Sequence, residues 1–389
     1  MANFYGQHIG FGAGSSVPPT PPDANPALTG GELWTCGRAT DGGLGVGNTT
    51  YYSSPVQVGS QTDWATGWMG DNASAFIKTT GKLYTWGEAG YGQNGRGGTT
   101  DVSSPVQVGS LTDWYIIGGG QHHWTAIKTD GTMWSCGRNA SGALGDLSTT
   151  DRSSPVQVGS DSDWLRLAGG CANFMGAIKT DGSLWSWGAG NYGATGHGNA
   201  TSVSSPVQIG TDKDWNWVQC AFNSMAAIKQ DGSLWWWGRG IDGHSPLGNT
   251  TAYSSPVQVG SLTTWKYLVM NGTTAVLSGG GGITTSGALW KWGTNANGNV
   301  WDSSTTDRNS PVQVGSLTDW ATIMGGSRDQ NFAIKTDGTL WSGGDAAGGA
   351  QMHGDVVDRS SPNQVGSLTT WNPNQVFGRT GESHTWSIK

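Results

Sequence analysis

The segment that decides the fold is SSPVQVGSLTDW, residues 103–114, because close copies of it return along most of the chain. There are seven copies, and in each a tryptophan follows the proline by nine residues. The pairs are Pro55 and Trp64, Pro105 and Trp114, Pro155 and Trp164, Pro206 and Trp215, Pro256 and Trp265, Pro311 and Trp320, and Pro362 and Trp371. A period of about 50 residues is typical of repeat proteins in which each unit is one supersecondary element.

Two further elements complete each unit. A segment G-x-L-W-x-W-G, or a close variant, begins at Gly31, Gly81, Gly131, Gly182, Gly232, Gly287 and Gly338, and A-I-K-T-D-G precedes it in most units. With P-V-Q-V and D-W-x-x-I, these segments have the alternation and length of short strands. The Asp-Gly pairs at 130–131, 181–182, 231–232 and 337–338 predict two-residue hairpin turns with a positive φ. Four antiparallel strands per unit and seven units predict an all-β fold, a seven-bladed β-propeller.

Composition agrees with an all-β chain and excludes several functions. Only 12% of the 389 residues are charged, while Gly reaches 66 and Trp 23, which disfavours a helical protein. The net charge is −7 without any basic run, so nucleic acid is not an expected partner. No apolar stretch approaches the roughly 20 residues that span a bilayer, so no membrane insertion is expected. The first residues, MANFYGQHIGFGAG, lack the features of a secretory signal, and we expect synthesis in the cytoplasm.

The two ends of the chain predict how the ring closes. GELWTCGR, residues 31–38, is a strand without its usual hairpin partner, and the chain stops at such a partner, residues 386–389. We therefore expect the N-terminal strand to complete the blade begun by residues 362–389, which hides two sheet edges. Residues 31–389 then form the propeller. Residues 1–30, with the proline-rich segment VPPTPPDANP, form an extended arm outside it.

Several stretches carry a family signature. GRATDGGLGVGNTTYYSSPVQV (37–58), GEAGYGQNGRGG (87–98) and GRNASGALGD (137–146) resemble the repeat of the regulator of chromosome condensation family, as do GGGQHHWT (118–125) and GESHT (381–385). The resemblance covers residues 31–389 and implies a seven-bladed propeller, in a viral, phage or bacterial member. It also implies a structural role for His123 and His384. It leaves function open, because members range from nucleotide exchange factors to chromatin binders and an inhibitor of β-lactamases.

No catalytic or metal-binding set is visible, so we expect no enzyme, no metal and no cofactor. Six lysines close the same strand of their units and predict a ring: Lys78, Lys128, Lys179, Lys229, Lys335 and Lys389. A second ring is predicted for Asp63, Asp113, Asp163, Asp214 and Asp319, with mutual pairing or solvation as its use. Cys36 and Cys136 stand where other units have tryptophan, so we expect core thiols. A bridge between Cys171 and Cys220 is possible.

Residues that break the repeat are the candidate binding residues. Trp68, Trp217, Trp236 and Trp301 stand where other units have unrelated residues, and exposed aromatics often anchor partners or stack on sugars. Local packing is the alternative. Between Leu277 and Leu289 the fifth unit adds residues around Gly280 and Gly281, which predicts a protruding hairpin that is either a contact element or a neutral insertion.

These features favour a non-catalytic binding or structural module. We expect a phage virion component, such as a tail, fibre or capsid-associated protein. It would be made in the host cytoplasm and located in the virion, and if it is not a virion protein we expect it in the cytoplasm. Its partners would be virion or surface proteins bound through Phe4, Tyr5, His8 and Phe11 of the arm, and a host-surface protein or glycan. A carbohydrate-binding adhesin and a guanine nucleotide exchange factor are the alternatives.

Overall fold

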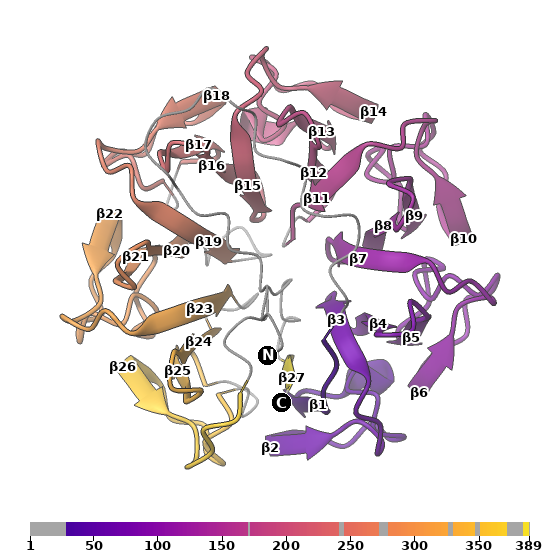
Figure 1. Ribbon diagram of the computed structural model, residues 1–389, viewed down its shortest axis with the longest axis horizontal. Helices are drawn as coiled ribbons and strands as arrows, with labels where there is room; N and C mark the ends of the chain where they lie inside the picture. Colours follow the sequence, from indigo (N-terminus) through magenta and orange to yellow (C-terminus); the bar gives the residue numbers. More distant parts are fainter. Residues whose placement is uncertain are drawn as a thin grey trace, which may run out of the picture.

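The strands form the blades of a disc arranged around a central axis (Figure 1). The structure is a computed structural model that describes residues 29–169, 172–240, 245–271, 279–325, 330–346, 351–371 and 384–388. In these ranges the strands form six four-stranded antiparallel sheets and one three-stranded sheet. The seven-bladed all-β propeller predicted from the repeat is confirmed.

Blades 1 to 6 each take four consecutive strands, β3–β6 through β23–β26. The innermost strands are β3 (Trp64–Met69), β7 (Trp114–Gly119), β11 (Trp164–Leu167), β15 (Trp215–Cys220), β19 (Trp265–Asn271) and β23 (Trp320–Gly325). The second strands are β4 (Ala73–Lys78), β8 (His123–Lys128), β12 (Phe174–Lys179), β16 (Ser224–Lys229), β20 (Gly279–Thr284) and β24 (Gln330–Lys335). The third are β5 (Leu83–Gly87), β9 (Met133–Gly137), β13 (Leu184–Gly188), β17 (Leu234–Gly238), β21 (Leu289–Gly293) and β25 (Leu340–Gly344). The outermost are β6 (Val102–Gln107), β10 (Arg152–Gln157), β14 (Val203–Gln208), β18 (Tyr253–Gln258), β22 (Arg308–Gln313) and β26 (Arg359–Gln364).

The closing blade combines both ends of the chain, but differently from the expectation. Its sheet has the order β2-β1-β27, with β1 (Leu33–Gly37) and β2 (Tyr52–Gln57) from the N-terminal side and β27 (His384–Ile388) from the C-terminal side. The N-terminal region thus supplies two strands rather than one, and Pro362 lies in β26 of blade 6. The proline strand is the outermost strand of a blade because it pairs with the strand that precedes it in the chain, as Tyr84 pairs with Gln107.

The hairpins between second and third strands keep the predicted glycine but have a longer loop. In blade 2 the Lys128 amide donates to the Thr132 carbonyl and the Gly131 amide to the Lys128 carbonyl, which leaves a three-residue loop. Gly131 has the predicted positive φ, +79°. The Asp130 carboxylate accepts from the Thr132 amide at 2.9 Å and from its hydroxyl at 2.7 Å. A three-residue loop ending in a left-handed glycine suits the twist of the hairpin, so the two-residue prediction is wrong.

The glycine run of blade 5 is not a protruding hairpin. Residues 279–284 form the second strand, β20, and the run is buried between β19 and β21. A Cβ at Gly280 would lie 2.6 Å from the Trp292 ring, and one at Gly281 would lie 3.0 Å from Ile323. Large neighbouring side chains therefore occupy the space that β20 leaves empty. The prediction of a protruding hairpin is therefore wrong for these residues. Glycine occurs here because a larger side chain would not fit between the neighbouring strands.

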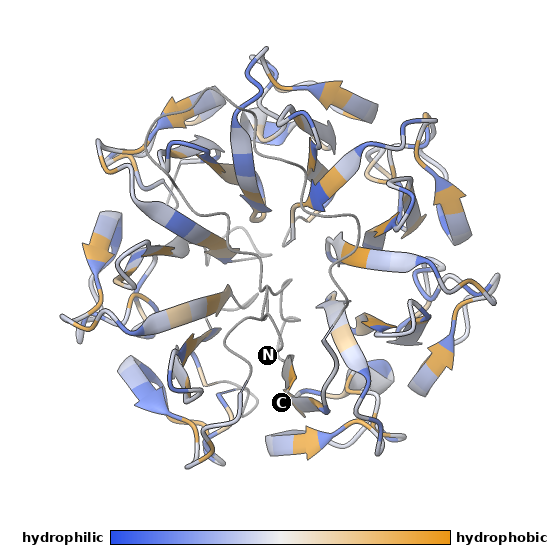
Figure 2. Cartoon of the chain, viewed as in Figure 1, coloured by the Kyte–Doolittle hydropathy of each residue, from blue (hydrophilic) through white to orange (hydrophobic). Residues whose placement is uncertain are grey.

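Two short 3-10 helices, η1 (Thr40–Gly42) and η2 (Asn191–Gly193), lie in long loops after the third strands. No helix in the described residues is long and apolar enough to cross a membrane. The hydrophobic core lies between neighbouring blades, and each interface is filled by tryptophans at the start of inner strands and in third strands. The fifth residue of the other outer strands is a valine, whereas β26 has Asn363 there and is hydrophilic (Figure 2).

The disc has two faces, because the strands of a blade run up and down between them. One face, here the Lys–Asp face, carries the starts of the inner strands and the hairpins after the second strands. The other, here the long-loop face, carries the loops that join the third strands to the outer ones. The candidate residues are assigned to these faces below.

Candidate binding surfaces

The predicted lysine and aspartate rings lie together on the Lys–Asp face. The five described ring lysines are Lys78, Lys128, Lys179, Lys229 and Lys335, and all are buried. Each ammonium lies over two aromatic rings, as Lys128 does at 4.9 Å from Trp114 and 4.5 Å from Trp134. Cation–π contact of this kind is strongest for tryptophan and for a desolvated cation. The rings therefore hold the lysines in place, while Lys389 lies outside the described residues.

Every described ring lysine pairs with its ring aspartate, which is the mutual pairing expected. The Lys78 Nζ is 2.9 Å from Asp63, and the others lie 3.0 to 3.4 Å from theirs. For Lys179 and Lys229, burial acts to lower the pKa, but hydrogen bonds to two aspartates each outweigh it and raise both pKa values. These charges are satisfied within the fold and do not by themselves form a site for an anion.

One position of the repeat divides the Lys–Asp face into two sectors. It lies two residues before the ring aspartate. In blades 3 and 4 it is Asp161 and Asp212, which give Lys179 and Lys229 a second carboxylate at 2.6 Å and 2.7 Å. In blade 2 it is Leu111, which is 45% exposed and stands alone beside the aspartates of blade 3. In blades 5 and 6 and the closing blade it is leucine three times in succession. The residues are Leu262, 37% exposed, Leu317, 47%, and Leu368, 45%.

We call these the Asp sector and the Leu sector. The Asp sector contains six aspartates: Asp161, Asp163, Asp181, Asp212, Asp214 and Asp231. It also contains three lysines, Lys179, Lys213 and Lys229. Six carboxylates facing three ammonium groups leave this sector negative. The Leu sector comprises Leu262, Leu317 and Leu368, which follow one another around the ring. The signal for this division in the sequence is the residue two positions before the ring aspartate of each repeat.

The four tryptophans that break the repeat are all buried, so the expectation of exposed anchors is wrong. Trp68 and Trp236 are 0% exposed, Trp301 is 2% and Trp217 is 9% exposed. Trp68 fills space at the glycines of blade 2, since a Cβ on Gly119 would lie 3.0 Å from its indole nitrogen. Trp217 donates from Nε1 to the Leu268 carbonyl at 3.0 Å in the next blade. Trp236 packs in the same core cluster as Trp217.

Trp301 shows why the expectation failed. In most units a glycine with positive φ, such as Gly145 at +72°, leaves room for the next blade's tryptophan, Trp187. In blade 6 the corresponding tryptophan is absent and Gly343 stands in its place. Trp301, at φ +64°, comes from the preceding loop and fills that space. The volume is conserved although its source changes, as close packing requires. The sequence LWSGG at 340–344 carried this signal.

Met352 and Cys36 repeat the compensation where the ring closes. Met352 has φ +65° at the position of Trp301 and packs in one core cluster with Cys36, which replaces the tryptophan of the closing blade. Cys36 and Cys136 are buried, as expected of core thiols, and burial raises the pKa of both to about 12. Cys171 and the arm residues Phe4, Tyr5, His8 and Phe11 lie outside the described residues, as does any bridge from Cys171 to Cys220.

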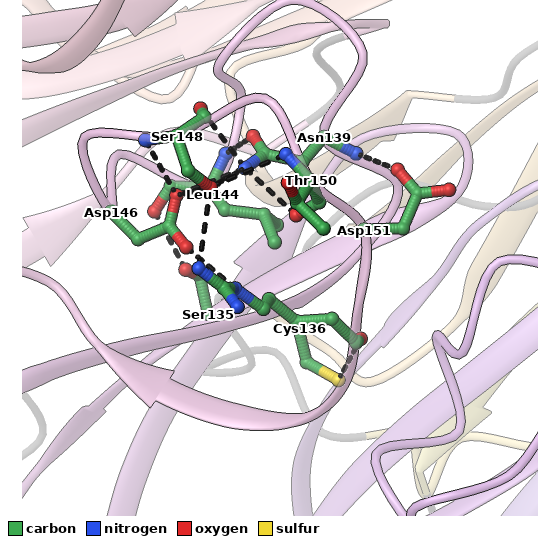
Figure 3. Close-up of polar contacts among 9 residues, drawn as sticks. Ser135, Cys136, Asn139, Leu144, Asp146, Ser148, Thr150 and Asp151 are labelled. Atoms are coloured by element: carbon green, nitrogen blue, oxygen red, sulfur yellow. Dashed lines mark hydrogen bonds and ion pairs between the residues drawn. The ribbon is translucent and has the colours of Figure 1, made fainter.

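The long-loop face is built from polar networks that satisfy themselves. In blade 2 the Asn139 amide donates to Asp146 at 2.9 Å and to the carbonyls of Ser148 and Thr150 at 3.1 Å (Figure 3). Asp146 also accepts from Ser148 and, at 2.7 Å, from Arg152. Burial alone would raise the pKa of Asp146, but these hydrogen bonds lower it. The same network recurs around Asn295 in blade 5.

The structure assembles one polar cluster that the sequence did not indicate. His122 lies 3.6 Å from a Glu88 oxygen and 3.9 Å from an Asp71 oxygen. Its ring is 5.0 Å from Tyr91, over which Arg138 lies at 5.0 Å. The nearby His122 ring is the main cause of the lowered pKa of Glu88. The five residues come from four chain segments of blades 1 and 2, so spacing could not reveal them.

Serine–histidine pairs also occur, but their geometry is structural. Ser186 and Ser342 lie 3.0 Å and 2.9 Å from His197 and His353. Each serine hydroxyl donates to a loop carbonyl, as Ser186 does to Thr195 at 2.6 Å. A hydroxyl that donates elsewhere is not activated by the imidazole. Among the described residues, no group of three His, Cys, Asp or Glu side chains has a geometry that could hold a metal ion.

The fold and its faces define a class of protein, a seven-bladed β-propeller made of repeats of about 50 residues. The sequence profile of the regulator of chromosome condensation (RCC1) repeat matches residues 80–127 and 181–226. The chain therefore contains segments that match the RCC1 repeat within a seven-bladed β-propeller. No curated protein sequence matches it.

Solved structures share the whole architecture at low sequence identity. Human WBSCR16 is 17% identical with a TM-score of 0.79, over 92% of this chain and 98% of that one. Prp20p from Saccharomyces cerevisiae, described with its binding to Gsp1p and histones, is 14% identical with a TM-score of 0.79, over 92% and 91%. Yeast RCC1 (Prp20) bound to Kap60 is 14% identical with a TM-score of 0.79, over 100% of this chain and 97% of that one. These identities establish the common fold alone.

Proposed function

We propose that this propeller is a non-catalytic binding scaffold that docks a protein partner on its Lys–Asp face. The division of that face carries the proposal. The Leu sector exposes three neighbouring leucines, and the Asp sector beside it holds an excess of carboxylates. Exposed apolar side chains next to a charged patch are typical of protein interfaces. The partner surface that fits this arrangement is apolar over blades 5 and 6 and basic over blades 3 and 4.

The non-catalytic character rests on the chemistry of the described side chains. The serine hydroxyls near histidines donate to backbone carbonyls, and the thiols of Cys36 and Cys136 are buried with raised pKa values. Prp20p is described with its binding to Gsp1p and histones and in a complex with Kap60, which supports a protein-binding role for a disc of this kind.

We further propose that the chain is a virion component of a phage or another virus, made in the host cytoplasm. Low charge and many hydroxyl side chains suit a protein that works outside cells. Density-gradient fractionation of the natural source tests this proposal. Co-sedimentation of the chain with particles in stoichiometric amounts supports it, and recovery only as a cytosolic monomer contradicts it.

Docking on the Lys–Asp face is tested by one matched pair of variants. Leu317→Asp places a charge in the Leu sector, whereas Leu147→Asp does the same at a leucine on the long-loop face that is 79% exposed. Complexes from the natural source are isolated by affinity with wild-type chain and each variant and compared by quantitative mass spectrometry. We expect the partner to be recovered with wild type and Leu147→Asp and lost at least tenfold with Leu317→Asp, because burying a carboxylate in an apolar contact costs several kcal/mol. Equal recovery by both variants contradicts the proposal.

The other two functions have less support. The four tryptophans that favoured a glycan partner are buried. For nucleotide exchange, the expected protruding hairpin of blade 5 is a buried strand. A nucleotide-release assay across small GTPases tests exchange directly, and stimulation by catalytic amounts of the chain would overturn the scaffold proposal.

A further inference from the structure

Two cations on the inner strands have no acidic partner within the part of the chain that the structure describes. Arg166 lies in β11 and Lys266 in β19, and neither pairs with a carboxylate among the described residues. The Arg166 guanidinium carbon lies 5.3 Å from the Trp217 ring, and the Lys266 Nζ lies 4.9 Å from the Tyr267 ring. The five ring lysines, by contrast, all pair with aspartate. These two positive charges therefore remain available to a ligand.

The four side chains form one row in which each contacts the next, and we call this row the cation stripe (Arg166, Trp217, Tyr267 and Lys266). The Trp217 and Tyr267 rings join its two cations, since their centroids are 5.6 Å apart at an interplanar angle of 71°. Trp217 is fixed by its hydrogen bond to Leu268. The stripe crosses β11, β15 and β19, which lie side by side on the inner edge of the disc (Figure 1).

Packing of the repeat does not require a cation here. The positions that correspond to Arg166 in blades 1, 2 and 6 are Thr66, Ile116 and Thr322. Burial is the main influence on Arg166 and lowers its pKa, while Tyr115 and Tyr267 oppose this shift. An arginine stays protonated in proteins despite such a shift, so Arg166 is a partly buried positive charge that no described carboxylate neutralises.

We propose that the cation stripe binds an anionic oxygen group, a carboxylate or a phosphate, at the centre of the disc. A guanidinium offers two parallel N–H donors that match either group, and Lys266 adds a second charge at the other end of the stripe. The aromatic rings orient both cations and exclude water from one side of each. This site goes beyond the docking role, because it uses neither the Leu sector nor the Asp sector.

A titration of the folded full chain at pH 7 tests the site with sodium phosphate and sodium acetate, each matched in ionic strength with sodium chloride. The Arg166 Nε–H resonance is followed by NMR, assigned by its loss in Arg166→Gln. We expect a saturable shift in the millimolar range with at least one oxyanion and none with chloride. The anion that saturates at the lower concentration tells whether a carboxylate or a phosphate is the ligand. A linear response that is identical in all three salts overturns the proposal.

Variants provide a second readout, the rise in melting temperature that each oxyanion produces above matched chloride. We expect Arg166→Gln to abolish the rise and Lys266→Gln to increase the half-saturating concentration about tenfold. Lys82→Gln, at a lysine between β4 and β5 that belongs to neither sector, should leave it unchanged. If Arg166→Gln does not fold, Lys266→Gln decides together with the wild-type titration. A rise that persists equally in Lys266→Gln and Lys82→Gln contradicts the proposal.

Discussion

Blades 3 and 4 and blades 5 and 6 solve the same packing problem with different residues. In blade 3, Gly145 gives room to Trp187 and Lys179 is held by two aspartates. Between blades 5 and 6, Trp301 fills the space beside Gly343. In blade 5, Thr284 occupies the position of the ring lysine. The comparison teaches that a propeller unit conserves buried volume and charge balance at each interface, not the identity of any one residue.

The tryptophan–glycine exchange gives the largest expected effect. Trp301→Gly should lower the free energy of unfolding by about 3–5 kcal/mol, because a fully buried indole is replaced by a cavity. Gly343→Trp should also destabilise, because its side chain would overlap the Trp301 indole. Chemical denaturation of both single variants measures these losses.

The double variant sharpens the exchange. Trp301→Gly with Gly343→Trp recreates the arrangement of Gly145 and Trp187, so it should recover to within about 1 kcal/mol of wild type. A double variant whose loss equals the sum of the single losses would show that the two sites do not share one space.

The second effect concerns lysines with two or one aspartate partners. Lys179→Met should lower the free energy of unfolding by about 2 kcal/mol, since it leaves Asp161 and Asp163 close together without a cation. Lys335→Met is the matched control with Asp319 alone, and it should cost about half as much. Equal losses in urea denaturation would contradict this assignment.

The same pair predicts a response to alkaline pH. The folded pKa of Lys179 is raised above its ordinary 10.5, so its stabilising contribution is complete below pH 10.5 and disappears as the pH rises through the folded value. Unfolding free energy measured against pH should therefore fall above pH 10.5 in wild type. The fall should be smaller in Lys179→Met, and identical curves would argue against the raised pKa.

Blade 5 offers the reverse experiment, with a smaller effect. Trp265 and Trp290 keep the edge-to-face geometry of the other blades, with centroids 6.3 Å apart, but Thr284 and Thr264 replace the ion pair. Thr284→Lys alone should destabilise by about 1 kcal/mol, because a partly buried ammonium lacks a carboxylate. Thr264→Asp with Thr284→Lys should restore stability. Melting temperatures that do not separate the single from the double variant would refute this pairing.

The exposed position that defines the two sectors should matter least to stability. Leu262→Asp and Asp161→Leu should each change the free energy of unfolding by about 0.5 kcal/mol or less, because both side chains lie at the surface. Thermal unfolding checks this expectation. A large change would assign these residues to the core of the fold rather than to a binding surface.

Much of the architecture could be predicted because the repeat is local information. The spacing of proline, tryptophan and Asp-Gly gave the number of blades, the four strands and the left-handed glycines such as Gly131. Side-chain alternation along a strand is set by the chain itself. The pairing of the lysine and aspartate rings followed from their common place in the unit.

The binding residues could not be predicted in the same way. In the sequence, Trp301 is an aromatic residue that the repeat does not explain. The structure explains it, because Trp301 lies beside Gly343, more than forty residues later in the chain. His122, Glu88 and Asp71 meet across two blades, and Arg166 meets Trp217 across the next interface. Contacts between blades depend on the closed ring, which the order of the residues does not display.

The sequence by itself determined the propeller, its seven units and the residues that each unit repeats. Only the tertiary structure decided which departures from the repeat are buried and which are exposed. The physical reason is that the hydrophobic core of a propeller lies between blades, so burial is shared by segments about 50 residues apart. The fate of a side chain there depends on the volume and charge that its neighbour in the next blade supplies.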